Sequence, residues 1–245
     1  MTMNALAVIL ARAGSKGLPH KNKLPLAGKP CLTWTLEHAL ASPSLDRILL
    51  STDSAEMARI GAQAGVEVVT RPYEFAHDTA PVDAAARHAV TSIIGNHEHI
   101  VILYGNVPVR PADLTERALA KLRQTDCDSV QSLCPVGKHH PFWMKSLDGP
   151  DRDQMRAYEE NQVDRRQDLP PLYQLDGGVI AVTRESLFNA VPKQPHSFLG
   201  SDRRAVLTEP GEVIDIDGPV DLHVAEATLQ LRQQEDRGGR SAAAG

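Results

Sequence analysis

A run of six apolar residues near the N-terminus, residues 5–10, leads directly into a polar loop with two glycines and four cations. An unbroken apolar run of this length is typical of a strand buried on both faces of a parallel sheet. Gly14 and Gly17 allow a tight turn and a close approach of the backbone to a ligand. The cations are Arg12, Lys16, Lys21 and Lys23. Such a loop predicts an anion site, most naturally for a nucleoside triphosphate, and a plain turn with solvated lysines is the alternative.

Apolar strands alternate with amphipathic helices through the first half of the chain. We expect strands at residues 47–53, 66–69 and 100–104, and helices at residues 31–40, 54–64 and 81–94, with a further helix opened by Pro111. This alternation predicts a three-layer α/β/α sandwich around a mostly parallel, Rossmann-like sheet.

The rhythm changes in the second half, where a polar, charged and proline-bounded segment leaves the sheet at about residues 138–172. Strands are expected again at residues 178–183 and around Ile214, followed by a closing helix at residues 220–231. With 245 residues and 42% hydrophobic content, the chain can bury one core, so we expect a single domain over residues 1–232. The charged and then Gly/Ala-rich residues 233–245 are expected to be a disordered tail.

Composition excludes several classes of partner. A net charge of −5 argues against nucleic acid as a partner of the general surface. Three cysteines without a Cys-x-x-Cys spacing argue against a disulfide framework or a zinc site, and favour a reducing compartment. We find neither a signal peptide nor a membrane-spanning run, so the expected location is the cytoplasm, with no membrane partner.

Two carboxylates near the C-terminus form the second strong signal. Asp215 and Asp217 are two positions apart, so in a strand both side chains point to the same face and can converge on one cation. A pair of carboxylates together with substrate phosphate is the usual way in which proteins bind Mg²⁺. The alternative is that Asp217 caps the last helix while Asp215 faces solvent.

The sequence Ala-Arg-Ala-Gly-Ser-Lys-Gly at residues 11–17, followed by Lys21-Asn22, resembles the signature of the acylneuraminate cytidylyltransferases, the CMP-sialic acid synthetases and their relatives. The resemblance covers about residues 5–231. It implies a nucleotidyltransferase domain with the fold of the nucleotide-diphospho-sugar transferases. Such an enzyme would activate an acidic, nonulosonate-type sugar with CTP, with release of pyrophosphate and with Mg²⁺ on Asp215 and Asp217. It further implies a homodimer in which residues around 140–172 reach towards the partner.

The same resemblance assigns roles in the nucleotide site. Arg12, Ser15, Lys16 and Lys21 would hold the triphosphate, and Asn22 would help to seat the cytidine. Arg12, Lys16 and Lys21 would also be catalytic, because cations neutralise the charge that develops on the leaving pyrophosphate. Asp217 or the metal is the candidate general base, and Lys23 is expected to be solvated. Arg71 would read the pyrimidine, whereas a surface arginine in a turn is the alternative.

The stretch after the predicted strand at residues 100–104 departs from the sialic acid enzymes. Tyr104 stands where the family usually has a glutamine that addresses the sugar. Gly-Asn-Val-Pro at residues 105–108 resembles the Gly-Asp-x-Pro of the Kdo cytidylyltransferases, with Asn106 in place of the metal-binding aspartate. Tyr104 and Asn106 are therefore candidate substrate residues. A Kdo-like or other sugar cytidylyltransferase, or a non-catalytic nucleotide-binding relative, remains open.

Further substrate residues are expected in and after the polar segment. Arg165, in preference to its neighbour Arg166, suits a sugar carboxylate because a guanidinium binds carboxylate bidentately, and a solvated charge run is the alternative. Tyr173 and Asp176 belong to a stretch that resembles the Asn-Gly-Ala of the family, with Asp176 in place of the asparagine. This replacement is a second indication of a changed sugar.

Overall fold

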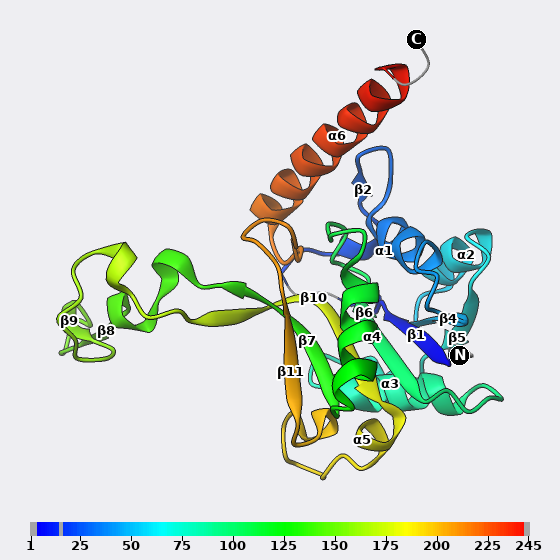
Figure 1. Cartoon of the computed structure of the whole chain (residues 1–245), viewed down its shortest axis with the longest axis horizontal. Coiled ribbons are helices and arrows are strands. Elements are labelled where there is room, and N and C mark those ends of the chain that lie inside the picture. The colour runs from blue at the N-terminus through cyan, green and yellow to red at the C-terminus, as the bar shows by residue number, and fades with distance from the viewer. Residues whose placement is uncertain (1–3, 15–16, 243–245) are drawn as a thin grey trace.

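The computed structural model describes residues 4–14 and 17–242, with side chains described as far as residue 235. A seven-stranded sheet forms its centre (Figure 1). In spatial order the strands are β11 (Arg203–Leu207), β7 (Ser129–Pro135), β10 (Tyr173–Thr183), β6 (His99–Tyr104), β1 (Ala5–Leu10), β4 (Arg47–Thr52) and β5 (Glu67–Thr70). Neighbouring strands are parallel except that β10 is antiparallel to both β6 and β7.

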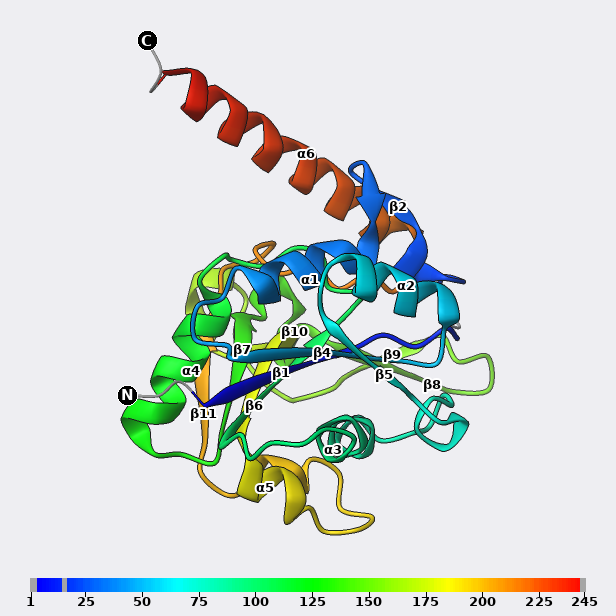
Figure 2. The same ribbon diagram turned by 90° about the vertical axis from the view of Figure 1, so that its right-hand side faces the viewer.

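Helices cover both faces of the sheet (Figure 2). One face carries α1 (Cys31–Leu40), α2 (Ala55–Gln63) and α4 (Leu114–Thr125), and the other carries α3 (Val82–Thr91) and α5 (Arg184–Phe188). The odd-numbered residues of β1 pack with the first group of helices and the even-numbered residues with the second. Burial on both sides explains why β1 is apolar at every position. The predicted three-layer α/β/α fold with a mostly parallel sheet is confirmed.

Local signals set the ends of α2. The side chain of Ser54 accepts a hydrogen bond from the backbone N–H of Met57 and so caps the helix. Gly65 follows the last turn with φ at +81°, the left-handed conformation that glycine adopts without strain. The helix expected from Pro111 begins instead at Leu114, because residues 111–113 form a turn before it.

Residues 136–172, which we call the arm, leave the sheet between β7 and β10. They contain a separate antiparallel pair, β8 (Lys145–Asp148) and β9 (Gln154–Ala157). Figure 1 shows the arm projecting far from the body of the molecule. Within the arm, several large apolar side chains are exposed, among them Leu147, Met155 and Tyr158.

The C-terminal helix α6 (Pro219–Ala242) is longer than predicted. Residues 233–242, expected to be disordered, continue the helix, and residues 243–245 lie outside the described part of the chain. The arginine, glutamines and glutamate at residues 232–235 are good helix formers, which favours continuation of the helix past Leu231. The helix projects from the body (Figures 1 and 2), and its first turns pack near the short hairpin of β2 (Pro25–Leu26) and β3 (Lys29–Pro30). None of the helices in the described part combines the length and apolarity that a membrane span requires.

Candidate active site

Strand β1 lies where the connections of the sheet change direction, because β4 and β6 flank it and the chain reaches them in turn. In open α/β sheets, ligands bind beyond the carboxyl ends of the strands at this point. A cavity of about 240 Å³, which we call the β1 cavity, lies here. It brings together six of the predicted residues, namely Arg12, Lys21, Asn22, Arg71, Tyr104 and Asn106. Ser15 and Lys16 lie outside the described residues.

The loop after β1 meets the segment that carries the two C-terminal aspartates. Lys21 Nζ lies 2.8 Å from Asp217 Oδ1. A Cβ atom at Gly17 would lie only 2.3 Å from the carbonyl oxygen of Asp217, so this position admits no side chain. The two strongest sequence signals therefore converge on one place.

Two carboxylates hold the first part of the loop. Arg12 Nη1 lies 2.5 Å from Asp78 Oδ1, which links the loop to the segment before α3. Asp53 Oδ1 accepts a hydrogen bond of 2.7 Å from the backbone N–H of Ala13. Contacts with the residue after β4 and with the segment before α3 therefore hold Arg12 and Ala13 in place.

Asn22 is buried and lines the β1 cavity. Its Nδ2 donates to the carbonyl oxygen of Arg12 at 3.2 Å. Its Oδ1 is buried on the side of Gly105 and has no hydrogen-bond partner among the described residues. Buried polar atoms are normally paired, so this acceptor is an exception at the edge of the cavity.

Arg71 is only 5% exposed, which excludes the alternative of a surface arginine in a turn. Its Nε donates to Ser51 Oγ at 3.0 Å and its Nη2 to the carbonyl oxygen of Ser51 at 2.6 Å. Burial lowers the pKa of Arg71 to about 10, so the group stays charged at neutral pH, helped by nearby Asp53. Within the described part of the chain, Nη1 is the guanidinium nitrogen left without a hydrogen-bond partner, and it is available to a ligand.

Tyr104 and Asn106 lie between the β1 cavity and Asp215. Burial, together with the charge of Asp215, raises the pKa of Tyr104 to about 12, so the phenol is neutral. Asn106 Nδ2 donates to Asp215 Oδ1 and to the carbonyl oxygen of Ile216. Asn106 thus acts as a donor to the carboxylate.

Asp215 and Asp217 follow an isolated bridge between Ile214 and Val109, and the backbone N–H of Ile216 bonds to Asn106, so the strand predicted around Ile214 is not a regular one. Burial, and then repulsion by Asp217, raises the pKa of Asp215 to about 6. The cap of α6 is Asp221, whose Oδ2 accepts from the backbone N–H groups of Asp217 and Gly218. Asp217 is thus free of the capping role that was its alternative.

This pair of carboxylates has the chemistry that Mg²⁺ requires. A cation between them would relieve the repulsion and the burial penalty that raise the pKa of Asp215. In the described residues, no group of three or more His, Cys, Asp or Glu side chains could hold a metal. Mg²⁺ commonly takes one or two carboxylates and completes its shell with substrate phosphates and water, so the pair is sufficient.

A second cavity of about 510 Å³, the arm-root cavity, lies where the arm joins β7 and β10. Asp176 lines it and is held on both oxygens. Oδ1 accepts from the backbone N–H of Gly178 at 2.9 Å and from Ser132 Oγ, and Oδ2 accepts from Thr208 Oγ1 at 2.6 Å. Gly177, the next residue, lies beside Asp215 and Tyr104, because a Cβ there would lie 3.6 Å from Asp215 Oδ2 and 4.0 Å from the ring of Tyr104.

Two predicted substrate residues are absent from the linings of both cavities. Gln174 and Asp176 line the arm-root cavity from one face of β10. Tyr173 lies on the opposite face of this strand and points away from the cavity. Arg165 is exposed and pairs with Asp168 at 2.7 Å, whereas Arg166 lines the cavity. Strand alternation from Asp176 could have identified Gln174. No periodic signal in the sequence distinguishes Arg166 from Arg165.

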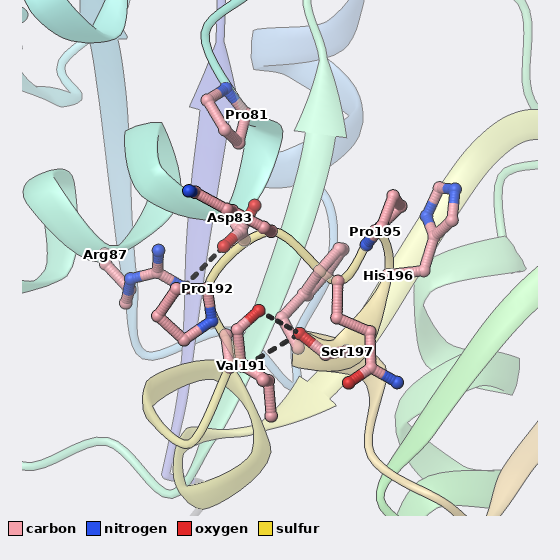
Figure 3. A pocket seen from close by; sticks show the side chains of 12 residues that line it. Pro81, Asp83, Arg87, Val191, Pro192, Pro195, His196 and Ser197 are labelled. Atoms are coloured by element: carbon pink, nitrogen blue, oxygen red, sulfur yellow. Dashed lines mark hydrogen bonds and ion pairs between the residues drawn. The ribbon is translucent and has the colours of Figure 1, made fainter.

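A third pocket of about 370 Å³ lies between α3 and residues 190–198 (Figure 3). It contains none of the predicted site residues. Two of its charged groups pair with each other, because Arg87 Nη1 lies 2.6 Å from Asp83 Oδ2, and Ser197 Oγ bonds to the backbone of Val191. Pro81 borders both this pocket and the β1 cavity.

Comparison with known proteins agrees with this geometry. Residues 6–197 match the model of a family described as cytidylyltransferase. The chain belongs to the cytidylyltransferase family. It is therefore a nucleotidyltransferase, and the resemblance carried by residues 11–17 and 21–22 is confirmed.

Relatives with full-length and partial matches support the assignment. The chain is 29% identical over 240 residues to CMP-N,N'-diacetyllegionaminic acid synthase of Legionella pneumophila, covering 95% of this chain and 99% of the relative. It is 37% identical over 239 residues to N-acylneuraminate cytidylyltransferase of Escherichia coli, covering 97% of this chain but only about half, 54%, of that protein. A structure of CMP:2-keto-3-deoxy-manno-octonic acid synthetase complexed with CTP has the same fold, with a TM-score of 0.72 at 17% identity, covering 93% of this chain and 99% of that chain.

Proposed function

We propose that this cytidylyltransferase transfers the CMP group of CTP to an acidic, nonulosonate-type sugar and releases pyrophosphate. The observation that carries the proposal is the convergence of Lys21 and Asp217 beside a cavity that also holds Arg12, Asn22 and Arg71. The names of the Legionella and E. coli relatives, a legionaminic acid synthase and an acylneuraminate cytidylyltransferase, support the class of sugar.

The β1 cavity suits cytosine in its hydrogen-bonding groups. Asn22 Oδ1 is a buried acceptor without a partner among the described residues, and cytosine has an exocyclic amino donor. Arg71 Nη1 is a donor for the carbonyl oxygen of the base. The ribose and phosphates would then extend towards Arg12 and Lys21.

The reaction requires in-line displacement at the α-phosphorus of CTP. A sugar hydroxyl forms the new P–O bond, and the bond to pyrophosphate breaks. Arg12 and Lys21, with Lys16, would stabilise the charge on the leaving group. Mg²⁺ bound by Asp215 and Asp217 would supply charge neutralisation at the phosphate and a lower pKa of the attacking hydroxyl. The candidates for promoting loss of the proton are the metal, which would lower the pKa of the hydroxyl, and Asp217, which lies beside Lys21.

The arm-root cavity is the proposed place of the acidic sugar. It lies across Gly177 from Asp215 and Tyr104, so a sugar there can present a hydroxyl to a phosphate in the β1 cavity. Arg166 and Lys138 line it and suit a carboxylate. Asp176, whose oxygens are already hydrogen bonded, would shape the cavity and accept from a sugar hydroxyl at a remaining lone pair.

We further propose that the protein is a homodimer and acts in the cytoplasm. Leu147 and Met155 form an exposed cross-strand pair on the arm, together with Tyr158, which is a surface that a second copy can cover. The buried thiols of Cys31 and Cys127 are free, which suits a reducing compartment.

A substrate screen tests the function. CTP is incubated with sialic, legionaminic, pseudaminic, deaminated nonulosonic and Kdo acids, with and without Mg²⁺, and pyrophosphate and the CMP-sugar are measured. We expect Mg²⁺-dependent turnover of at least one nine-carbon acid. Turnover of Kdo alone would establish the Kdo-like alternative. Binding of CTP without release of pyrophosphate on any acidic sugar would contradict the proposal.

A further inference from the structure

Arg110 is a buried cation that forms no ion pair within the described part of the chain. It is 5% exposed, and burial lowers its pKa to about 9 although Asp215 and Asp176 are close enough to oppose the shift. A guanidinium without a carboxylate partner is among the most costly groups to bury. Its retention beside the site therefore requires an explanation other than stability.

The donors of Arg110 are distributed over backbone carbonyls and one hydroxyl. Nε donates to the carbonyl oxygen of Gly178 at 2.7 Å, and Nη2 donates to that of Tyr104 at 2.9 Å. Nη1 donates to the carbonyl oxygen of Val107 and to Thr35 Oγ1. One planar group thus joins the chain after β6 to the bend of β10, and each of these segments borders the place where Asp215 lies.

The segment after β6 also holds Asp215 directly. The backbone N–H of Ile214 donates to the carbonyl oxygen of Val109 at 3.2 Å, and that of Ile216 donates to the carbonyl oxygen of Asn106 at 2.9 Å. Asp215 lies between these two bonds, and the side chain of Asn106 donates to its carboxylate. A displacement of residues 104–109 would therefore displace Asp215 as well.

The groups that would bind CTP are supported separately. Arg71 is held by Ser51, Arg12 by Asp78, and the loop after β1 by Asp53. Arg110 makes no hydrogen bond to any of these residues. The guanidinium thus supports the wall of the β1 cavity that carries Tyr104 and Asn106 beside Asp215, and the contacts of Arg71 and Arg12 do not depend on it.

We propose that Arg110 is a positioning residue for the sugar-activating side of the site. It holds the carbonyl oxygens of Tyr104, Val107 and Gly178 and so fixes the segments that contain Asn106 and Gly177. These segments in turn position Asp215. The inference depends on the proposed function for its kinetic consequences but not for its structural ones. A lysine has no planar fork and cannot reach three carbonyls and a hydroxyl at once, so the role requires arginine.

The test compares Arg110→Met and Arg110→Lys with Arg117→Met, a matched control on α4 where the arginine contacts Asp113 and the carbonyl oxygen of Leu207. For Arg110→Met we expect kcat to fall about 100-fold and the KM of the sugar to rise, because the groups that position the reacting atoms would be displaced. The dissociation constant of CTP, from calorimetry without Mg²⁺, should stay within about threefold of that of the unaltered protein. Arg110→Lys should be intermediate.

Hydrogen exchange gives a readout that does not require turnover. Exchange should quicken at residues 104–109 and 176–178 in Arg110→Lys and Arg110→Met, but not in Arg117→Met. Unchanged exchange there, or a fall in CTP-binding stoichiometry that accounts for the whole loss of kcat, would overturn the inference. If Arg110→Met does not fold, Arg110→Lys decides by the same criteria. Failure of the unaltered protein to turn over any acidic sugar would refute the proposed function while leaving the exchange test of Arg110 intact.

Discussion

The ammonium group of Lys21 lies 2.8 Å from the carboxylate of Asp217, although 196 positions separate the two residues along the chain. The Asp217 side chain is 76% exposed, so this ion pair contributes little to stability. The ion pair matters for position rather than for stability, because it holds a cation of the first loop beside the aspartates that precede α6. Both ends of the sequence are needed to form this site.

Replacement of Lys21 by methionine should reduce turnover strongly. A cation that stabilises a leaving pyrophosphate is worth about 2–4 kcal/mol in the transition state, so kcat/KM should fall about 30- to 1000-fold in a pyrophosphate-release assay. Lys23→Met is the matched control, because Lys23 pairs with Glu56 and does not line the β1 cavity. Equal losses of kcat/KM in both variants would show that the effect comes from the net charge of the loop and not from the position of Lys21.

Replacement of Asp215 by asparagine should remove the dependence on Mg²⁺. An amide is a weaker, neutral ligand, so we expect kcat to fall at least about 100-fold. CTP affinity, measured by calorimetry, should no longer increase when Mg²⁺ is added. Asp221→Asn should retain both properties, since asparagine can also cap α6. Retention of the Mg²⁺ effect on CTP binding in Asp215→Asn would contradict the proposed ligand set.

Arg71 and Ser51 should act together in recognising the base. Ser51→Ala removes the Oγ acceptor of Nε but leaves the carbonyl acceptor of Nη2, so the KM of CTP should rise about 2- to 10-fold. Arg71→Lys loses the fork and should have the larger effect, with reduced preference for CTP over UTP. Arg59→Lys, at an exposed position of α2, is the control. An unchanged ratio of kcat/KM values for the two nucleotides would exclude Arg71 as a base reader.

His38 should make stability depend on pH. Burial, and then the charge of Arg110, lowers the pKa of His38 to about 3 in the folded protein, where Nε2 lies 2.8 Å from Thr115 Oγ1. The unfolded chain, with a histidine pKa of about 6.5, binds a proton that the folded protein does not. The free energy of unfolding is therefore highest above about pH 6.5 and decreases as the pH is lowered. At pH 5, this residue alone reduces the free energy of unfolding by about 2 kcal/mol.

Urea unfolding at pH 7.5 and pH 5 checks this expectation. His38→Gln should show a smaller loss of unfolding free energy between the two pH values than the unaltered protein. His97 and His99, whose pKa values burial also lowers, contribute in the same direction, and Asp215, whose pKa is raised to about 6, contributes in the opposite direction. Both contributions are shared by the variant and the unaltered protein and cancel in the comparison. An identical slope in the variant would rule out His38 as the source.

The arm should control assembly. Leu147 and Met155 are 56% and 74% exposed and lie opposite one another in the β8–β9 pair. Replacing both by glutamate should convert a dimer into a monomer in sedimentation velocity, because buried charge opposes association. Ile94→Glu, at a residue that is 95% exposed and outside the arm, should remain dimeric. A monomeric unaltered protein would refute the proposed dimer.

Much of the fold could be predicted because its signals are local. An apolar run with no polar face, as in β1, specifies burial on both sides, and Ser54 and Gly65 mark the ends of α2. The gathering of Lys21, Arg71 and Asn106 was also predictable, since parallel strands present their carboxyl ends at one edge. The assignment of Arg71 to the base came from family resemblance rather than from spacing.

The parts that could not be predicted depend on long-range contacts or on the direction of single side chains. Arg110 and Ser51 act through bonds to backbone carbonyls or buried side chains that no pattern in the sequence encodes. Tyr173 and Gln174 are neighbours on opposite faces of one strand, so an error of one position exchanges their roles. Arg165 and Arg166 lie in a segment without periodicity, and only the path of the arm separates them.

Strands β7 and β10 pair residue by residue from Tyr173 to Leu175, next to the arm, and pair again in the central sheet from Ile180 after a shift of register. Asp176 and Gly177 occupy this shift. A displacement of the arm would therefore also displace the bend at Asp176 and Gly177, which lies between the arm-root cavity and Asp215. The proposed dimer surface and the proposed sugar site would therefore evolve together, because a substitution that changes the position of the arm would also change the shape of the sugar site.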